Sequence, residues 1–192
     1  MDNSDKVIGY IEFLGEGGMI GEIVPYTSAE KFKNDILDSL DCGQPMTPVV
    51  FPDELDVPLQ FDADTYFPWG FRSEKRESFP YEIYQTNRRD LVFMPYSPAR
   101  LLAGVKDYKL VYQGKMERWE TLDSIYSQHN RDDRPNANAM RSVSVSDIIV
   151  THKNGETHAF YVQPFGYRQV DKLLPELKNT KSPIPKAEQH ER

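Results

Sequence analysis

Apolar and polar residues alternate near the start of the chain, which is the pattern of β-strands. Two such runs, at positions 7–14 and 19–24, flank the sequence Gly15-Glu16-Gly17-Gly18. Glycine supplies the backbone conformations that a tight turn requires. We therefore expect a β-hairpin with these glycines in its turn.

The next segment changes to a helical period. Thr27 and Glu30 fit a capping box, with Thr27 as N-cap and Glu30 at the third helical position. The predicted helix places on one face Phe32, Ile36, Leu37 and Leu40. A strand at 47–51 follows, so this part of the chain reads as a ββαβ unit.

Further along, short strands and helices alternate. We expect extended segments at 81–85, 91–94 and 108–112. A short helix is predicted for 97–104, with Ser97 as N-cap and Gly104 just past the end. A second helix starts near Thr121, and its apolar face is Leu122, Ile125, Tyr126 and His129.

The sharpest local signal is Asn154-Gly155 between two apolar runs, because this dipeptide is typical of a two-residue hairpin turn. The predicted strands are 148–153 and 156–161, with Lys153 opposite Glu156 and His152 opposite Thr157. Both faces are apolar away from the turn, so we expect a hairpin buried on both sides and central to its sheet. Ser146-Asp147 is expected to begin the first strand.

The order of these segments resembles a known family. The matching stretches are Ile-Tyr-Gln at 83–85, Phe-Met-Pro-Tyr at 93–96, Leu-Val-Tyr at 110–112, Thr-Leu at 121–122, Ser-Val-Ser-Asp-Ile-Ile-Val at 144–150 and Tyr-Val-x-x-Phe-Gly-Tyr-Arg at 161–168. From about Tyr81 to Leu174 the chain is similar to the YodL-like domain. The resemblance implies a setting in bacterial mobile elements and carries no catalytic residues with it.

These observations predict an α+β protein: a small ββαβ N-terminal unit followed by a mixed, mostly antiparallel sheet domain with two short helices. The expected boundaries are an acidic unit at 1–51, a connector rich in proline and aromatic residues at 52–80, the YodL-like domain at 81–175 and a mobile tail at 176–192.

Composition agrees with a folded chain, because 39% of the residues are hydrophobic and 28% are charged. The sequence has no run of about 18 apolar residues, and its start lacks the features of a signal peptide. We therefore expect a soluble, cytoplasmic protein. Charge is uneven: the net charge is −11 over residues 1–70 and +4 over residues 71–192.

Candidate catalytic and cofactor motifs are weak. The glycines at 15–18 lie between two strands, whereas a phosphate loop leads from a strand into a helix. Asp62-Ala63-Asp64 lacks the glycine and the final glutamate of a calcium loop. Cys42 is the single cysteine and reads as a packed residue or a loop thiol. Neither Ser144 nor Ser146 has the glycine-flanked elbow of a nucleophile.

The histidines do not form a metal pair in this interpretation, since the hairpin register puts His152 and His158 on opposite faces of the sheet. His129 is predicted to be a half-buried core residue rather than a base. We therefore expect no catalytic residues, no metal and no cofactor.

The connector offers the candidate interaction surface, because acidic and aromatic side chains alternate in it. Its members are Asp53, Glu54, Asp56, Phe61, Asp62, Asp64, Tyr66 and Trp69. Aromatic residues anchor interfaces and surrounding charge steers the encounter, so a protein partner, one of basic character, is the expectation. The alternative is that these aromatics cover the chain's own core.

Three classes of function follow from the sequence. The leading one is a non-enzymatic accessory or protein-interaction protein of a bacterial mobile element. The alternative is a nucleic-acid-related protein such as an acidic DNA mimic, although direct binding of nucleic acid is not expected without a longer basic cluster than Arg88-Arg89. The third is a hydrolase or transferase with an unrecognised site. No membrane contact is expected.

The cysteine and histidine pattern predicts that folding does not depend on a metal ion, because one cysteine and dispersed histidines cannot build a structural zinc site. Elemental analysis of the purified protein should find less than one zinc per chain, and a chelator should leave the melting temperature unchanged. Stoichiometric zinc together with unfolding on chelation would contradict this prediction.

Overall fold

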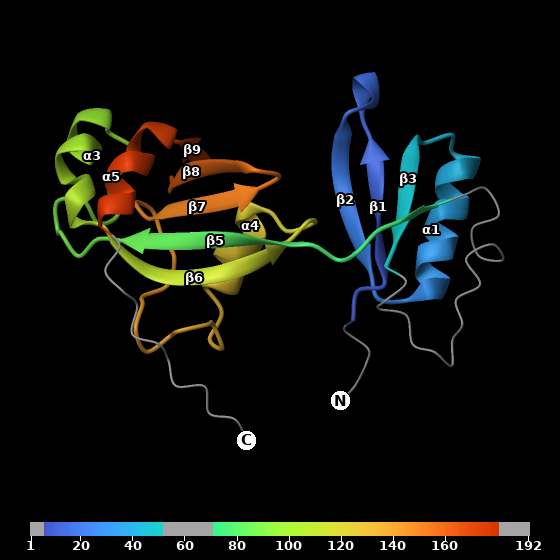
Figure 1. Ribbon diagram of the computed structural model, residues 1–192, viewed down its shortest axis with the longest axis horizontal. Coiled ribbons are helices and arrows are strands. Elements are labelled where there is room, and N and C mark those ends of the chain that lie inside the picture. Colours follow the sequence, from blue (N-terminus) through green and yellow to red (C-terminus); the bar gives the residue numbers. More distant parts are fainter. Residues whose placement is uncertain (1–5, 52–70, 181–192) are drawn as a thin grey trace. The chain divides into compact units, whose positions relative to one another are not determined.

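The computed structural model describes residues 6–51 and 71–180, and these form two units that divide between Glu77 and Ser78 (Figure 1). Each unit has its own sheet with at least one helix packed on it, so the predicted α+β class is confirmed. Within the described residues, no helix is long and apolar enough to span a bilayer. Positions 52–70 and 181–192 lie outside the described residues. The first part of the predicted tail, 176–179, belongs to helix α5 (Leu174–Asn179), whose Leu177 is buried, so the tail was predicted to begin too early.

The described part of the N-terminal unit is a four-stranded sheet of order β2-β1-β3-β4 and one helix. Its elements are β1 (Gly9–Leu14), the 3-10 turn η2 (Glu16–Gly18), β2 (Ile20–Tyr26), α1 (Ala29–Asp41), β3 (Met46–Val50) and β4 (Arg72–Ser73). The predicted β1–β2 hairpin is confirmed, and Gly17 and Gly18 in its turn have φ values of 73° and 74°. β4 pairs in parallel with β3, so part of the predicted connector is a strand of this sheet.

The start of α1 differs from the predicted one. Ser28 is the N-cap, and its hydroxyl accepts a hydrogen bond from the Lys31 amide at 3.3 Å. The helix therefore begins one residue later than expected, and the capping box between Thr27 and Glu30 is wrong. Either hydroxyl could serve as a cap, so the sequence pattern alone does not choose between them.

The buried face of α1 is narrower than predicted. Phe32 and Ile36 are fully buried, but Leu37 and Leu40 are 37% and 46% exposed. Ser39 takes the next position on the buried stripe, where its hydroxyl donates to the Asp35 carbonyl oxygen at 2.6 Å. At 100° per residue Leu37 and Leu40 lie to the side of this stripe, so their assignment to the core was wrong.

The core of this unit lies between α1 and the sheet. It contains Ile11, Tyr26, Phe32, Ile36 and Val50, and the rings of Tyr26 and Phe32 stack at 4.7 Å. Gly9 is required here, because a Cβ at this position would lie 2.3 Å from the Val49 carbonyl oxygen and 2.7 Å from the Phe32 ring.

The other face of the sheet carries a buried acid. Glu12 is 2% exposed, and its carboxylate pairs with the Arg72 guanidinium at 3.0 Å. Tyr10 donates to Glu74 on the same face. Because a buried carboxylate is costly without a partner, this pair ties β1 to the β4 segment.

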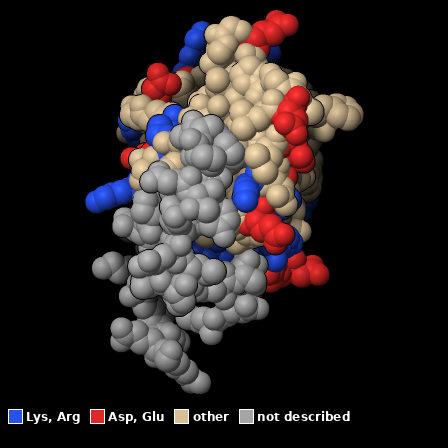
Figure 2. Space-filling model, turned by 90° about the vertical axis from the view of Figure 1, so that its right-hand side faces the viewer, with Lys and Arg blue, Asp and Glu red and all other residues tan. Residues whose placement is uncertain are grey.

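Both signs of charge occur on the side of the molecule shown in Figure 2. Half of the fourteen acidic residues in positions 1–70 lie at 2, 5 and 53–64, outside the described residues. The negative surplus of the N-terminal half is therefore carried largely by those segments, and the described part of this unit has a mixed surface.

The C-terminal unit is an antiparallel five-stranded sheet of order β6-β5-β7-β8-β9 with helices on both faces (Figure 1). Its elements are β5 (Ser78–Gln85), α3 (Pro98–Gly104), η4 (Val105–Asp107), β6 (Lys109–Glu117), α4 (Leu122–Gln128), β7 (Ile148–Lys153), β8 (Glu156–Val162), β9 (Tyr167–Gln169), η5 (Asp171–Leu173) and α5 (Leu174–Asn179). α3 and α5 cover one face through Leu101 and Leu177, and α4 covers the other through Ile125.

The predicted Asn154-Gly155 hairpin is confirmed, including its register. Lys153 is opposite Glu156, His152 is opposite Thr157, and β7 is the central strand of the sheet. The two turn residues have φ values of 55° and 80°, as a two-residue turn of this type requires. Apolar side chains from both faces of the hairpin are buried, among them Ile148, Ile149, Val150, Ala159, Tyr161 and Val162.

Two local predictions for this unit were wrong. Residues 91–94 form a turn rather than a strand: Leu91 is buried, whereas Phe93 has a φ of 60° and is 65% exposed. Ser146 and Asp147 also form a turn, and the strand begins at Ile148. α4 starts near Thr121 as predicted, and Thr121 is its N-cap, in a capping box with Ser124.

His129 is fully buried beside two tyrosines, more deeply than predicted. Its Nε2 lies 2.9 Å from the Tyr81 hydroxyl, and its ring meets that of Tyr112 edge-on at 4.5 Å. Burial lowers the pKa of His129 to about 4, and Arg134 adds to this effect. The folded unit therefore holds a neutral imidazole, while the unfolded chain has an ordinary histidine.

This shift predicts a loss of stability in acid. Because the pKa of His129 is depressed on folding, its contribution is present above the unfolded value of about 6.5 and is lost as pH falls toward the folded value. The unfolding free energy of the wild type, measured relative to that of His129→Asn, should drop by about 2 kcal/mol between about pH 7 and about pH 4.5. Urea denaturation of both proteins measures this difference, and a constant difference would contradict the prediction; His152→Asn is the control.

Candidate functional site

A buried carboxylate lies at the turn that leads into the central strand of the C-terminal sheet. Asp147 has no exposed surface, although aspartate is rarely buried fully. It follows Ser146, which has a φ of 82°. A non-glycine residue in this conformation is uncommon and persists where the surroundings hold it.

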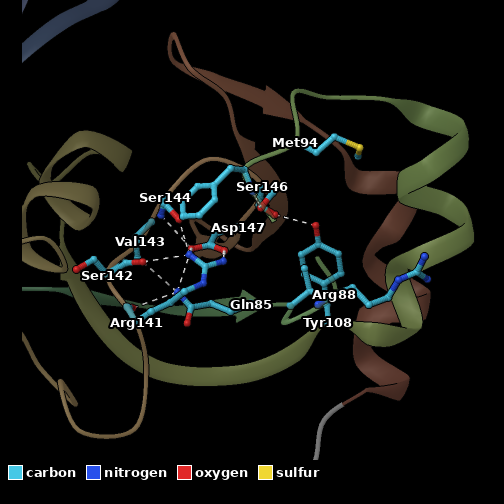
Figure 3. A network of polar contacts seen from close by, with 12 residues as sticks. Gln85, Arg88, Met94, Tyr108, Arg141, Ser142, Val143, Ser144, Ser146 and Asp147 are labelled. Atoms are coloured by element: carbon cyan, nitrogen blue, oxygen red, sulfur yellow. Dashed lines mark hydrogen bonds and ion pairs between the residues drawn. The ribbon is translucent and has the colours of Figure 1, made fainter. Parts of the chain in front are cut away.

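Donors from three parts of the chain converge on this carboxylate (Figure 3). Arg141 donates to both carboxylate oxygens, at 2.9 Å for the Nη1–Oδ2 contact. Gln85, at the end of β5, donates from Nε2 to Oδ2 at 2.9 Å, and the Ser144 amide donates to the same oxygen at 3.0 Å. The turn is closed by the Asp147 amide, which donates to the Ser144 carbonyl oxygen at 3.0 Å.

Burial and these donors together set the protonation state of Asp147. Burial raises the pKa of Asp147 to about 6, while Arg141, the Ser144 amide and Gln85 act in the opposite direction. The carboxylate is therefore ionised at neutral pH. Arg141 is 29% exposed at its side chain and connects this buried charge to the surface.

The same turn fixes the loop at 91–96. The Ser146 hydroxyl accepts from the Phe93 amide at 3.1 Å, and the Ser146 carbonyl oxygen accepts from the Tyr108 hydroxyl at 2.8 Å. Tyr161 donates to the Met94 carbonyl oxygen at 2.7 Å, and burial raises the pKa of both tyrosines. The Arg141 guanidinium lies 5.8 Å from the centre of the Phe93 ring, within reach of a cation–π contact.

Tyr96, at the end of this loop, lies in the wall of a groove. A depression of about 610 Å³ lies between α3 and the segment from β9 to η5. Its apolar lining consists of Tyr96, Pro98, Leu101, Leu102, Val170 and Leu173. Tyr96 packs edge-on against Tyr161 at 5.7 Å, and Leu102 leaves 59% of its surface exposed.

Charged residues lie at the rim of this groove. Asp171 is engaged, since it accepts from the Ala159 amide at 2.8 Å and from the Gln169 side chain at 2.6 Å. Arg168 stacks over Tyr96 with 5.3 Å between the guanidinium carbon and the ring centre, and Lys172 also lines the groove. Arg168 and Lys172 are exposed, whereas Asp171 is partly buried and hydrogen-bonded, so the exposed charge at the rim is positive.

The groove adjoins an open sheet edge. β9 pairs with β8 on one side and lies at the end of the sheet among the described strands. The Val170 amide donates to the Ala159 carbonyl oxygen, and the Gln163 amide donates to the Gly166 carbonyl oxygen. Because residues of an antiparallel strand alternate in direction, the backbone N–H and C=O groups of Tyr167 and Gln169 point outward.

The residues that the sequence singled out as an interaction surface cannot be placed at this site. Asp53, Glu54, Asp56, Phe61, Asp62, Asp64, Tyr66 and Trp69 all lie outside the described residues. The prediction that they contact a basic partner stays a prediction. Cys42 is exposed at the end of α1.

The histidine pair lies as predicted, on opposite faces of the hairpin. His152 Nδ1 contacts the Thr157 hydroxyl at 2.9 Å, and His158 contacts Asp171 at 3.0 Å and Glu156 at 3.1 Å. Hydrogen bonds to Asp171 and Glu156 raise the pKa of His158. Within residues 6–51 and 71–180, no three side chains of the metal-binding types are close enough together to hold an ion.

The sequence pattern did not predict that these residues form a site. Arg141, Ser146 and Asp147 are near one another in the chain, but Gln85, Phe93 and Tyr108 are far from them. An acidic residue directly before an apolar strand is a weak signal of a buried carboxylate. Its partners can be found only once the sheet is formed.

Comparison with known proteins supports the resemblance found in the sequence. Residues 80–172, which include the whole Asp147 network, match the family model of the YodL-like domain. No curated protein and no solved structure matches this chain.

The buried pair of Asp147 and Arg141 predicts a large loss of stability when Asp147 is neutralised. In Asp147→Asn the amide nitrogen would face donors, and Arg141 would lose its counter-charge, so the unfolding free energy should fall by roughly 2–4 kcal/mol. Asp133→Asn is the matched control, because Asp133 pairs with Arg131 at 2.9 Å with both side chains exposed. That variant should lose less than about 1 kcal/mol. Equal losses in the two variants, measured by denaturation, would contradict the assignment.

Proposed function

We propose that this chain, whose C-terminal unit carries a YodL-like domain, is a non-enzymatic accessory protein that binds an extended segment of a partner protein. The observation that carries the proposal is the open edge of β9 beside the apolar groove lined by Tyr96 and Leu102. The partner segment adds to the sheet as a further strand and places side chains in the groove.

Backbone groups supply the first part of this interaction. The outward N–H and C=O groups of Tyr167 and Gln169 offer two donors and two acceptors at the sheet edge. An exposed edge is a ready template for another strand, and strand addition is a recurrent way in which domains bind peptides. β9 is three residues long, so backbone pairing alone gives a short ladder and needs side-chain contacts beside it.

Side chains supply the selectivity. Successive residues of an extended segment point to opposite faces, so every second side chain of the partner faces the groove. The apolar lining accepts an aliphatic or aromatic residue there. Arg168 and Lys172 at the rim favour Asp or Glu next to it. The segment that fits is therefore extended, with an apolar anchor and neighbouring acids.

Exposed apolar surface supports the same location. Leu102 beside the groove is 59% exposed, and Phe165 in the turn before β9 is 95% exposed. Single exposed apolar residues are ordinary, so these two support the proposal only through their place beside the groove and before β9. The groove and a three-residue edge are small, which favours a transient complex over a permanent one.

The acidic segment at 53–69 is a second candidate contact, for a partner of basic character. It rests on the charge and aromatic pattern of the sequence. The setting in a bacterial mobile element rests on the family resemblance. A nucleic-acid-related role for the acidic half and an unrecognised hydrolase or transferase activity remain the alternatives.

A peptide-display selection on the full chain tests the proposed edge. We expect enriched peptides in which an apolar residue is flanked by acids, and their binding should shift the amide resonances of residues 167–170. Gln169→Pro removes the outward N–H while leaving the inward bond of Val170 to Ala159 in place. This variant should weaken binding at least about tenfold, the equivalent of one lost hydrogen bond and its neighbours.

The matched control is Gln169→Ala, which removes the same side chain and keeps the N–H group. It should bind the selected peptides as the wild type does, with both variants retaining their melting temperature within a few degrees. Equal binding by the proline variant, or resonance shifts confined to residues outside the groove and β9, would show the proposal to be wrong.

A further inference from the structure

A second depression, on a different part of the C-terminal unit, collects basic side chains. It has a volume of about 490 Å³. Four cationic residues line it: Arg88 after β5, Lys106 in η4, Lys109 at the start of β6, and Arg141 before the Asp147 turn. They come from three separate parts of the chain, around 88, 106–109 and 141, so the fold and not one local charge run brings them together.

The two arginines are held in place by carboxylates. Arg88 donates from Nε to Asp90 at 3.0 Å and from Nη1 to Asp107 at 2.7 Å. Arg141 is fixed by the buried Asp147. Each guanidinium has five N–H groups. The contacts of Arg88 to Asp90 and Asp107 use three of them. Arg141 keeps a second Nη2 N–H beyond its contacts to Asp147, Ser142 and Ser144, so both arginines can still donate to a further anion. Because the arginines are already ordered, a ligand loses little side-chain entropy by binding to them.

The two lysines differ from the arginines. Lys106 and Lys109 are exposed, and the described part of the chain provides no ion pair for either of them. The exposed Arg89 lines a smaller adjoining depression of about 330 Å³ that shares Asn87 and Arg141 with this one. When Asp90, Asp107 and Asp147 are counted against Arg89 and the four cations of the larger depression, the two adjoining depressions together keep a net charge of +2.

We propose that this basic depression, lined by Arg88, Lys106, Lys109 and Arg141, binds the phosphate group of a small phosphorylated molecule. Arginine forks and lysine point charges are the groups with which proteins bind phosphate. Cations that converge from several segments suit a tetrahedral group with several charged oxygens better than a planar carboxylate. The volume lies within the range of small-molecule sites. The inference is independent of peptide binding at β9.

Asn87 adds a neutral donor at the wall, since its exposed side-chain amide carries two N–H groups. The side-chain amide of Gln85 is already committed to Asp147 and to the carbonyl oxygens of Arg141 and Ser142. Gln85 therefore positions Arg141 rather than the ligand.

Titration of the full chain with inorganic phosphate, followed by amide resonances, tests the site. We expect shifts at Asn87, Lys106, Lys109 and Arg141. Acetate at equal ionic strength should bind severalfold more weakly. Lys106→Ala combined with Lys109→Ala changes the net charge of the two adjoining depressions from +2 to 0, so the dissociation constant should rise about tenfold or more while the fold is kept.

The matched control is Lys75→Ala combined with Lys115→Ala, which removes the same charge from two exposed lysines outside the depression. It should bind phosphate as the wild type does. An equal loss in both double variants would mean a general charge effect and would overturn the proposal, as would equal binding of acetate and phosphate.

A mononucleotide and a single-stranded oligonucleotide distinguish the source of the phosphate. AMP should bind at least as tightly as inorganic phosphate and lose affinity in the Lys106/Lys109 double variant. An oligonucleotide that binds far more tightly, with an affinity that falls steeply with salt, would contradict the small-molecule assignment and indicate a nucleic-acid backbone.

Discussion

A carboxylate without access to water has to be paired, and Asp147 meets this condition with donors from its own turn, from the loop before it and from a distant strand. Gln85 comes from β5, Arg141 from the loop before the turn, and the Ser144 amide from the turn itself. An isolated buried charge costs several kcal/mol, so the loss of any one of these donors should destabilise the unit. The Asp147 turn is therefore a fixed point that connects β5, β7 and the loops at this end of the sheet.

The proposed surfaces are both built outward from that turn. On one side Ser146 and Tyr161 hold the loop at 91–96, which ends in Tyr96 at the wall of the apolar groove. On the other side Asp147 orients Arg141 at the basic depression. Loops are the least stable parts of a fold, so binding surfaces made of loops need an anchor in the sheet. The positive φ of Ser146 is the local strain that this anchor holds in place.

Local chemistry decided which parts could be predicted from sequence. The Asn154-Gly155 turn, with alternating apolar strands, specifies its own register, and the start of α4 near Thr121 is set by short-range hydrogen bonds. The prediction of the α1 cap was wrong because Thr27 and Ser28 are adjacent and chemically alike. The strand prediction at 91–94 was wrong because the apolar composition suits a strand, whereas the Phe93 amide is held by the hydroxyl of Ser146, more than fifty residues away.

The candidate site could not be predicted for the same reason. The separations within the network, from Gln85 to Asp147 and from Phe93 to Ser146, exceed fifty residues, so no spacing rule connects them. The open edge of β9 could not be predicted from the sequence either, because the order of strands in a sheet is not a property of any one segment. The sequence did place the acidic and aromatic residues at 53–69 together, and that pattern stays a prediction about contacts with a partner.

Native-state hydrogen exchange of the Phe93 amide tests most directly whether the Asp147 turn supports the groove. Ser146→Gly removes the hydroxyl that accepts from this amide and tolerates the positive φ, so the turn itself should persist. In this variant we predict that the Phe93 amide exchanges at least about tenfold faster, as expected for the loss of one hydrogen bond. The amides of Ile149 and Val150 in β7 should keep the protection of the wild type. Unchanged exchange at Phe93, or an equal loss across the whole sheet, would contradict the account.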